Sequence, residues 1–162
     1  MSEEANREQT ACFTGHRPEK LHKPEWMIKR ALKREIRRAI ADGYKVFISG
    51  MARGVDIWAA QIVLALRNSG SDITLVCACP CRDFQRRWDE AWKVQTAEVL
   101  AKADRIEYIC ENYTRFCFQK RNEWMVDRSS RVIAVYNGEP GGTKNTVDYA
   151  ARKGVQVVVI NS

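Results

Sequence analysis

The sequence predicts an α/β fold, a doubly wound and mostly parallel sheet of about six strands with helices on both faces. Three observations support this prediction. Short β-branched and aromatic runs alternate along the chain with longer segments of helical periodicity. Four of the runs are apolar nearly throughout, as strands covered on both faces should be. Two glycine-rich turns each connect such a run to a helix-forming segment, which is how α/β proteins present backbone N–H groups to a phosphate.

The elements can be placed in order along the chain. The first strand covers 10–14, and the first helix covers 25–41, where Ile28, Leu32, Ile36 and Ile40 form an apolar stripe that ends at Asp42-Gly43. The other strands are expected at 45–48, 73–78, 105–110, 131–136 and 155–160, and the other helices at 55–66, 83–103, 116–127 and 145–153. Within 83–103, the residues Phe84, Trp88, Trp92, Gln95 and Val99 follow helical spacing, which predicts an aromatic stripe in the core.

Length and composition indicate one globular domain over 10–162, preceded by a polar tail over 1–9. No apolar run approaches the roughly 18 residues of a membrane helix, and the tail has no apolar segment typical of a secretory signal. We therefore expect a cytoplasmic protein without a membrane partner. A homodimer is one open alternative for its assembly, and an unidentified protein partner is another.

The six cysteines fit a reducing compartment. Cys77-x-Cys79-x-Cys81 could place three sulfurs on one side of a strand. A metal site would need further ligands, and the chain has only His16 and His22. We expect the cysteines to pack as small hydrophobic residues and expect no metal site and no required cofactor.

The net charge is +7, and much of it lies in the basic segment from Lys29 to Arg38. On a helix these bases would lie on the solvated face, which is the simpler interpretation. A nucleic-acid patch is the alternative, but no aromatic residue is interleaved with these bases.

Three unusual loops follow predicted strands at the carboxyl edge of the sheet, where ligands bind in such folds. The first supplies a hydroxyl, a backbone amide, an imidazole and a guanidinium from Thr14, Gly15, His16 and Arg17, and the arginine could hold a phosphate bidentately. The second loop contains Ser49, Gly50, Met51, Ala52, Gly54 and Asp56. It is neither a Walker A loop nor a dinucleotide fingerprint, and Asp56 could either cap the next helix or accept from a ribose hydroxyl.

The third loop is the strongest of the three. Gly141 and Gly142 expose the backbone, Thr143 and Thr146 supply hydroxyls, and Asn145 could cap the following helix. Upstream, Arg121, Asn122 and Met125 lie on a predicted helix, where Arg121 and Met125 share a face that could look into the same crevice.

Together these motifs resemble the YpsA-like family of the SLOG superfamily over about residues 10–160. The resemblance rests on Ala11 to Pro18, Gly50 to Asp56, Arg121-Asn122-x-x-Met125-Val126-Asp127 and Gly141-Gly142-Thr143-x-Asn145-Thr146, which occur in this order. It implies a Rossmann-like domain that binds a nucleotide or an ADP-ribose-like ligand, as a sensor rather than as an enzyme.

The same superfamily contains the lonely-guy phosphoribohydrolases and the DNA-processing protein DprA, which imply two alternatives. The first is a nucleoside monophosphate N-glycosidase with Asp148 and Arg121 as catalytic residues, or with Asp56 in place of Asp148. In the phosphoribohydrolase motifs, Asn122 replaces a lysine and Asp148 stands where the catalytic glutamate would be, one methylene shorter. The resemblance therefore implies that the phosphate cradle is kept and the catalytic pair is altered. The second alternative is DprA-like binding of single-stranded DNA.

Overall fold

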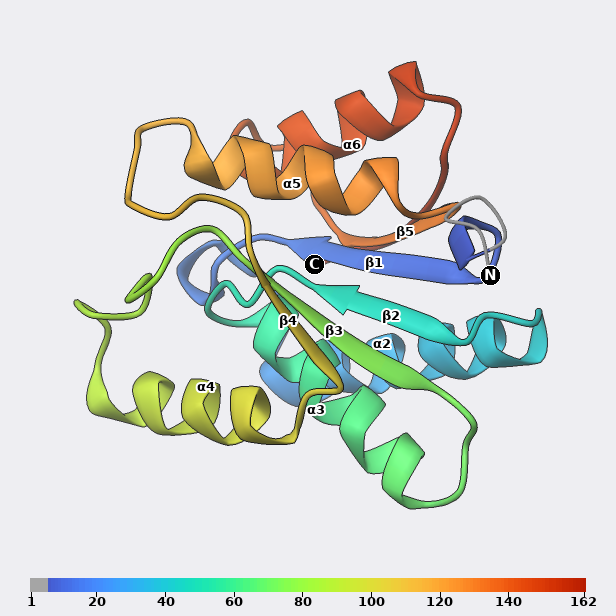
Figure 1. The fold of residues 1–162 in the computed structure, drawn as a ribbon. Helices are drawn as coiled ribbons and strands as arrows, with labels where there is room; N and C mark the ends of the chain where they lie inside the picture. The colour runs from blue at the N-terminus through green and yellow to red at the C-terminus, as the bar shows by residue number, and fades with distance from the viewer. Residues whose placement is uncertain (1–5) are drawn as a thin grey trace.

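The structure is a computed structural model that describes residues 6–162 (Figure 1). Its centre is a six-stranded sheet with the order β4-β3-β2-β1-β5-β6, in which every neighbouring pair is parallel. The strands are β1 (Thr10–Gly15), β2 (Val46–Ser49), β3 (Thr74–Cys79), β4 (Arg105–Tyr108), β5 (Arg131–Val135) and β6 (Gln156–Ile160). The predicted doubly wound α/β fold is therefore confirmed.

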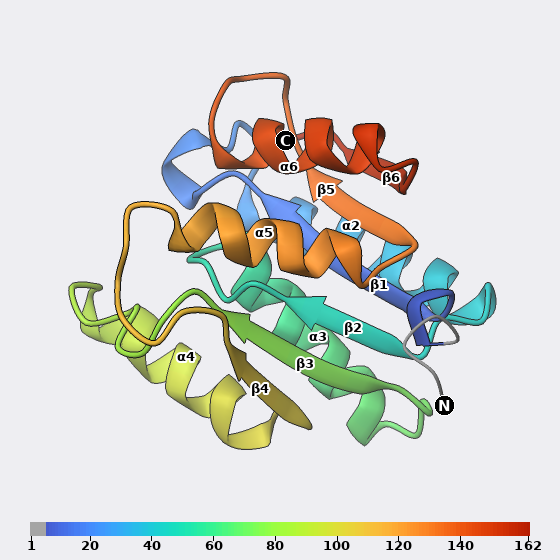
Figure 2. The ribbon, with the colours of Figure 1, turned by 45° about the horizontal axis from the view of Figure 1, so that its top comes forward.

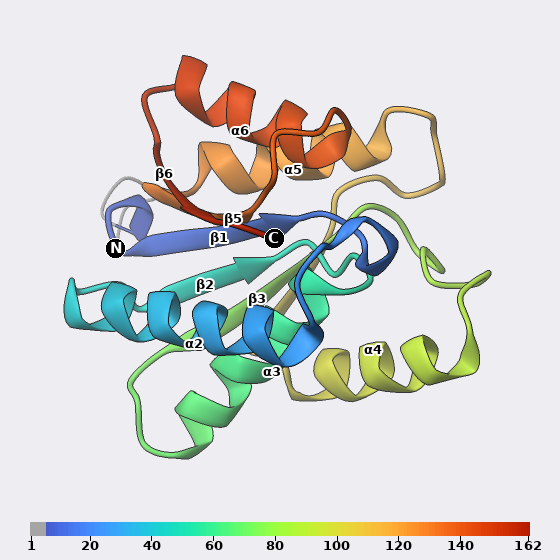
Figure 3. The same ribbon diagram turned by 180° about the vertical axis from the view of Figure 1, so that it is seen from behind.

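Helices cover both faces of the sheet. Figures 1 and 2 show α5 and α6 together on one face, and the view from behind shows α2 and α3 on the other (Figure 3). The helices are α2 (Glu25–Ala41), α3 (Val55–Asn68), α4 (Glu90–Lys102), α5 (Cys117–Asp127) and α6 (Gly142–Arg152), and a short 3-10 helix spans Pro18–Lys20. None of the helices in the described residues is both long and apolar enough to cross a membrane.

The two layers of helices enclose two hydrophobic cores, one on each side of the sheet. In β1, Phe13 belongs to the core that α2 and α3 cover, and Cys12 belongs to the core that α5 and α6 cover. Both side chains are fully buried because successive residues of a strand point to opposite faces. This two-sided burial explains why the central strands are apolar nearly throughout.

The cysteines contribute to these cores as thiols. Cys12, Cys77, Cys79, Cys81 and Cys117 are buried, and Cys110 is half-buried. Burial raises the pKa of Cys12 and of Cys79 to about 12, so both are protonated at neutral pH. Residues 6–162 contain no group of three histidine, cysteine or acidic side chains placed to hold a metal ion.

The largest error of the sequence-based assignment concerns 83–103. Helix α4 begins only at Glu90, and turns occupy 82–87. Asp83 has a positive φ of 55°, and Asp89 has extended backbone dihedrals directly before the helix, so neither continues a helix. Two hydrogen bonds of turn spacing, from Arg86 N–H to the Asp83 carbonyl and from Trp88 N–H to the Gln85 carbonyl, replace helical ones. The core stripe therefore does not include Trp88.

The start of the last helix also differs from the prediction. Helix α6 begins at Gly142, three residues earlier than expected, and its N-cap residue is Gly141. Asn145 consequently lies inside the first turn, where its N–H donates to the Gly141 carbonyl, and it does not cap the helix. Gly141 has a φ of 141°, a conformation that side-chain-bearing residues rarely adopt, so glycine determines where this helix starts.

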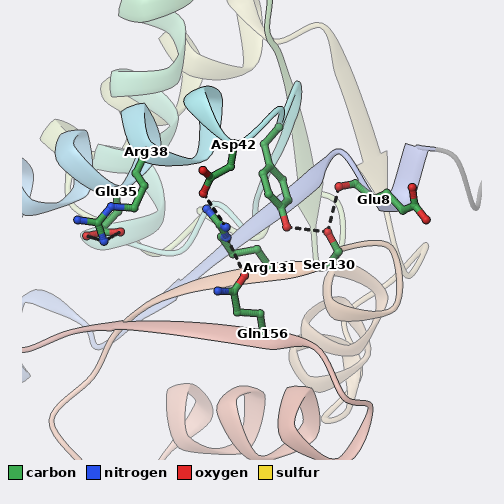
Figure 4. A network of polar contacts seen from close by, with 8 residues as sticks. Glu8, Glu35, Arg38, Asp42, Ser130, Arg131 and Gln156 are labelled. Carbon is green, nitrogen blue, oxygen red and sulfur yellow. Dashed lines mark hydrogen bonds and ion pairs between the residues drawn. The ribbon is translucent and has the colours of Figure 1, made fainter.

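A polar network closes the amino edge of the sheet, opposite the predicted ligand edge (Figure 4). Arg131 at the start of β5 donates to Asp42 after α2 and to Gln156 of β6, both at 2.9 Å. Its guanidinium also lies 4.6 Å from the centre of the Tyr44 ring, and Tyr44 bonds to Ser130 at 2.8 Å. One side chain thus connects the end of α2 to two strands.

We expect Arg131→Ala to lower the free energy of unfolding by about 1–3 kcal/mol, because a mostly buried cation with two charge-assisted or polar partners is lost. Chemical denaturation measures the change. Exposed Arg105, which pairs with Glu107 two residues away, is the matched control, and Arg105→Ala should cost under about 1 kcal/mol. Equal effects of the two substitutions would contradict a structural role for the Arg131 network.

Candidate functional site

A cavity of about 400 Å³ lies at the carboxyl edge of the sheet, within the size range of small-molecule sites. The segments that follow β1, β2, β3 and β5 contribute to its wall, together with α5. The chain runs from β1 out to β4 and then returns to place β5 on the other side of β1. The cavity therefore lies beside the point where the strand order reverses, which is where doubly wound folds bind ligands.

Most of the residues predicted for the site line this cavity. They are Thr14, Gly15, His16, Arg17, Met51, Ala52, Asp56, Arg121, Asn122, Gly141, Gly142 and Thr143. Residues from three distant loops and one helix thus meet as expected.

The other predicted residues do not line the cavity: Ser49, Gly50, Gly54, Met125, Asn145, Thr146 and Asp148. Met125 is buried in the core beneath α5, away from the crevice into which it was expected to look. The Thr146 hydroxyl donates to the Gly142 carbonyl at 2.9 Å, so it serves the helix itself. Asp148 pairs with Lys144 at 2.7 Å on the same helix.

The N-terminus of α6 forms the anion-favouring end of the cavity. No side chain caps this helix, and no acidic residue occurs in its first turn. The N–H groups at the start of an α-helix have no partner within the helix, so those of Gly142 and Thr143 are available to a ligand. The Lys20 ammonium would lie 3.6 Å from a β-carbon placed on Gly141, so a positive charge adds to the helix dipole at this point.

Arg121 of α5 supplies a second positive charge to the cavity. It is only 6% exposed, and its guanidinium donates to the Gly50 carbonyl and to the Asn122 side-chain oxygen. Its Nη2 has no hydrogen-bond partner among residues 6–162. A β-carbon on Gly50 would come within 3.0 Å of the Arg121 side chain, so the glycine leaves the space that the arginine occupies.

Two amides of the turn after β2 are already bonded within the protein. The Met51 N–H donates to the Ser49 hydroxyl at 3.2 Å, and the Ala52 N–H donates to the Asp56 carboxylate at 3.2 Å. The Ser49 hydroxyl in turn donates to the Asp56 carbonyl. The Asp56 carboxylate therefore lies in this turn, where a bound anion was expected. It does not cap α3, and the amides of Met51 and Ala52 are not free.

Asp56 is the only acidic residue that lines the cavity within the described part of the chain. Burial raises the pKa of Asp56 to about 6, while the charge of Arg121 and the Ala52 N–H oppose the rise. His16 is 4% exposed, its ring accepts from the Asn137 N–H at 3.4 Å, and burial lowers the pKa of its imidazole. His16 is therefore neutral at pH 7 and supports the loop after β5.

The raised pKa of Asp56 has a consequence for stability. The folded protein holds the Asp56 proton more tightly than the unfolded chain, so the protonated carboxyl adds to the free energy of unfolding. This contribution is complete below pH 4 and is lost as pH rises to about 6. The change from 3.8 to about 6 corresponds to about 3 kcal/mol. We expect Asp56→Asn to remove this loss, because asparagine keeps an acceptor for Ala52 and cannot ionise.

Chemical denaturation of both proteins from pH 4 to pH 7 tests this expectation. As pH rises across that range, the free energy of unfolding of Asp56→Asn should increase relative to that of the wild type. Other carboxylates titrate in both proteins and cancel in the difference. A difference that does not change with pH would show that the Asp56 pKa is not raised.

Several cavity residues were missed by the sequence analysis, namely Lys20, Arg53, Pro80, Phe84, Trp88 and Phe118. Pro80, Phe84 and Trp88 follow β3, an inner strand of the sheet, and the segment after this strand was not expected to bind a ligand. Their position directly after an apolar strand was the signal that could have identified them. Phe84 and Trp88 were instead assigned to a helical core stripe.

A comparison with family models then identifies the chain. The model described as "YspA SLOG family" (YpsA) matches residues 11–158, from β1 into β6. The chain belongs to this family. The match includes every loop that borders the cavity, so the site described above lies within the part that defines the YpsA family.

Relatives in other organisms extend over most of the chain. The UPF0398 proteins of Bacillus thuringiensis (strain Al Hakam) and Bacillus cereus (strain G9842) are each 30% identical over 153 residues. Each match covers 88% of this chain and 83% of the relative. The names of these relatives state no activity.

Solved structures show the same fold. DNA processing protein A (DprA) from Streptococcus pneumoniae superposes with a TM-score of 0.66 at 19% identity, over 97% of this chain and 52% of that one. DprA from Helicobacter pylori, described for its single-stranded DNA binding mode, gives 0.68 at 20% identity, over 95% and 66%. The YpsA-family chain thus spans about half to two thirds of these proteins and shares their Rossmann-like architecture.

Proposed function

We propose that this YpsA-family protein binds a nucleotide or an ADP-ribose-like ligand in the cavity and acts as a sensor of that ligand. The observation that carries the proposal is the uncapped N-terminus of α6, which opens into a cavity that also contains Arg17, Lys20 and Arg121. Within the described residues Arg17 and Lys20 form no ion pair, so their charge is available to a phosphate. A helix N-terminus with nearby cations is a favourable phosphate site.

A thermal-shift screen tests the proposal with AMP, GMP, CMP, UMP and ADP-ribose at millimolar concentration. A ligand present at about 100 times its Kd adds about 2.7 kcal/mol of stability, which raises Tm by several degrees. We expect at least one of these compounds to do so. If none raises Tm, and isothermal titration also detects no binding, the proposal is wrong.

Binding without turnover fits the cavity better than an N-glycosidase does. Such an enzyme needs a carboxylate facing the sugar to stabilise its oxocarbenium-like transition state. Asp148 and Asp56 were the expected candidates. Asp148 pairs with Lys144 and does not line the cavity, and the Asp56 carboxylate, which does line it, accepts from the Ala52 N–H. Incubation with nucleoside monophosphates, followed by detection of free base, separates the hypotheses. Base release that Asp56→Asn abolishes would establish an enzyme with Asp56 as its catalytic carboxylate.

A second candidate function is the binding of single-stranded DNA on α2, favoured by one specific observation. Trp26 is 61% exposed and precedes Arg30, Lys33 and Arg37 by four, seven and eleven residues, so all four share one stripe of the helix. These three bases form no ion pair within residues 6–162. The aromatic residue that appeared to be lacking therefore lies at the end of the basic stripe, where a base could stack on it.

Fluorescence anisotropy with a labelled oligothymidine tests this second function. We expect affinity to fall steeply with salt, and to be lost in Arg30→Glu/Arg37→Glu but kept in the matched control Arg152→Glu/Lys153→Glu on α6. Equal loss in both double variants would indicate nonspecific charge attraction. Unchanged affinity in Arg30→Glu/Arg37→Glu would place any DNA binding elsewhere.

A further inference from the structure

Aromatic side chains line one end of the cavity, and a site for an anion alone does not require them. Pro80, Phe84 and Trp88, from the segment after β3, line this end, and the ring of Phe118 of α5 lines the cavity 5.7 Å from the Arg121 guanidinium. The rings of Phe84 and Trp88 are 5.5 Å apart and nearly perpendicular, at 84°. Edge-to-face packing of this kind fixes the orientation of both rings.

The core does not account for Trp88. Phe84 and Trp92 both pack against the larger hydrophobic core, and Trp92 also contacts Trp58 at 6.2 Å. Trp88 is half-buried and, in the described part of the chain, belongs to neither core. Its remaining apolar surface faces the cavity that it lines, where it is available to a ligand.

The segment that carries these rings also has an unsatisfied polar atom. The Gln85 side-chain oxygen is buried and has no hydrogen-bond partner among the described residues. Buried polar atoms are almost always hydrogen-bonded, so each exception needs an explanation. This is a second observation, independent of the rings, that sets the 81–88 segment apart from ordinary core structure.

The aromatic end and the anion end of the cavity lie at different strands of the sheet. The aromatic segment follows β3, the anion site follows β5, and β2 and β1 lie between them. A ligand that uses both ends must carry an anionic group and a flat apolar group joined by a polar spacer.

We propose that the Phe84–Trp88 end is a nucleobase subsite, so that the ligand class is a nucleotide with its base against Trp88 and its phosphate at α6. The spacer is then the ribose, which passes Asp56 and Asn122 in the middle of the cavity. This inference rests on the proposed function. It adds that sugar phosphates and free phosphate are poor ligands, because they leave the aromatic end empty.

Isothermal titration with ribose 5-phosphate, and with AMP, GMP, CMP and UMP, tests the subsite. Stacking of a base on an aromatic side chain corresponds to about a five- to hundredfold gain in affinity. In the wild type we expect the best nucleotide to bind more tightly than ribose 5-phosphate by a factor in this range. Trp88→Ala should lower nucleotide affinity to the level of ribose 5-phosphate, while ribose 5-phosphate itself binds unchanged.

Two further variants make the result specific. Trp88→Phe keeps a ring and should retain most of the preference for the nucleotide, which a merely structural loss would not allow. Trp124→Ala, at a half-buried tryptophan of α5 that does not line the cavity, is the matched control and should change neither affinity. Thermal unfolding confirms that each variant is folded.

The outcomes separate the two proposals. If ribose 5-phosphate and the nucleotides bind the wild type equally, or if Trp88→Ala keeps the preference, the nucleobase subsite is refuted while the anion site stands. If neither a nucleotide nor ribose 5-phosphate binds, the proposed function itself fails. A preference that is lost in Trp88→Ala and retained in Trp88→Phe supports the subsite.

Discussion

Arg121→Met is expected to lower the free energy of unfolding by about 3–5 kcal/mol, the largest effect of any single substitution in the site. Arg121 is only 6% exposed, and its positive charge offsets the negative charge of the buried Asp56 carboxylate. Its removal also leaves the Gly50 carbonyl and the Asn122 side chain without their donor. Chemical denaturation at pH 7 measures the loss.

A double variant identifies the cause of that loss. Asp56→Asn in the Arg121→Met background removes the uncompensated charge, so we expect it to restore part of the stability. Arg128→Met is the control from the end of the same helix, where the arginine is exposed and lies 4.1 Å from the centre of the Trp124 ring. Additive effects of Asp56→Asn and Arg121→Met would contradict the coupling between the two groups.

Gly142→Asp is expected to abolish phosphate binding, with at least a hundredfold loss of affinity, and to leave the fold intact. A β-carbon at Gly142 would meet nothing within 4 Å, so the side chain fits without displacing any neighbour. Its carboxylate would occupy the place of the phosphate at the N-terminus of α6 and repel a second anion. An acidic residue in the first turn favours the helix by about 0.3–1 kcal/mol, so Tm should be equal or slightly higher.

Isothermal titration with the best nucleotide from the thermal-shift screen measures this effect. Gly142→Ala and Gly142→Asn are the matched controls, because they add a side chain without a charge and should keep affinity within several-fold. A nucleotide affinity that Gly142→Asp leaves intact would mean that the phosphate does not bind at α6. The cavity would then use another part of its wall.

The fold was predictable because its signals are local and agree with one another. Helix α2 has the bounds that its apolar stripe and Asp42-Gly43 predicted, and the order of strands and helices followed from periodicity alone. The segment 82–89 was not predictable in this way. Phe84 and Trp88 are spaced as in a helix, but Asp83 adopts a positive φ, which spacing does not reveal.

The site shows the same division between what spacing reveals and what it does not. The carboxyl ends of β1 and β5 meet in any sheet of this class, so the loops of Arg17 and Gly142 were found from sequence. The bonds in the turn after β2 depend on side-chain rotamers. A glycine pattern alone could not show that Asp56 and Ser49 already occupy the amides of Ala52 and Met51.

The carboxylate held in that turn also bears on the charge of the proposed ligand. Asp56 lines the cavity, and its negative charge at pH 7 would oppose a chain of phosphates but could accept from sugar hydroxyls. The lining of the cavity includes cationic, acidic and aromatic side chains, so its two ends differ in chemistry. For the proposed nucleotide we therefore expect a single orientation in the cavity, and we expect monophosphates to bind more tightly than long polyphosphates.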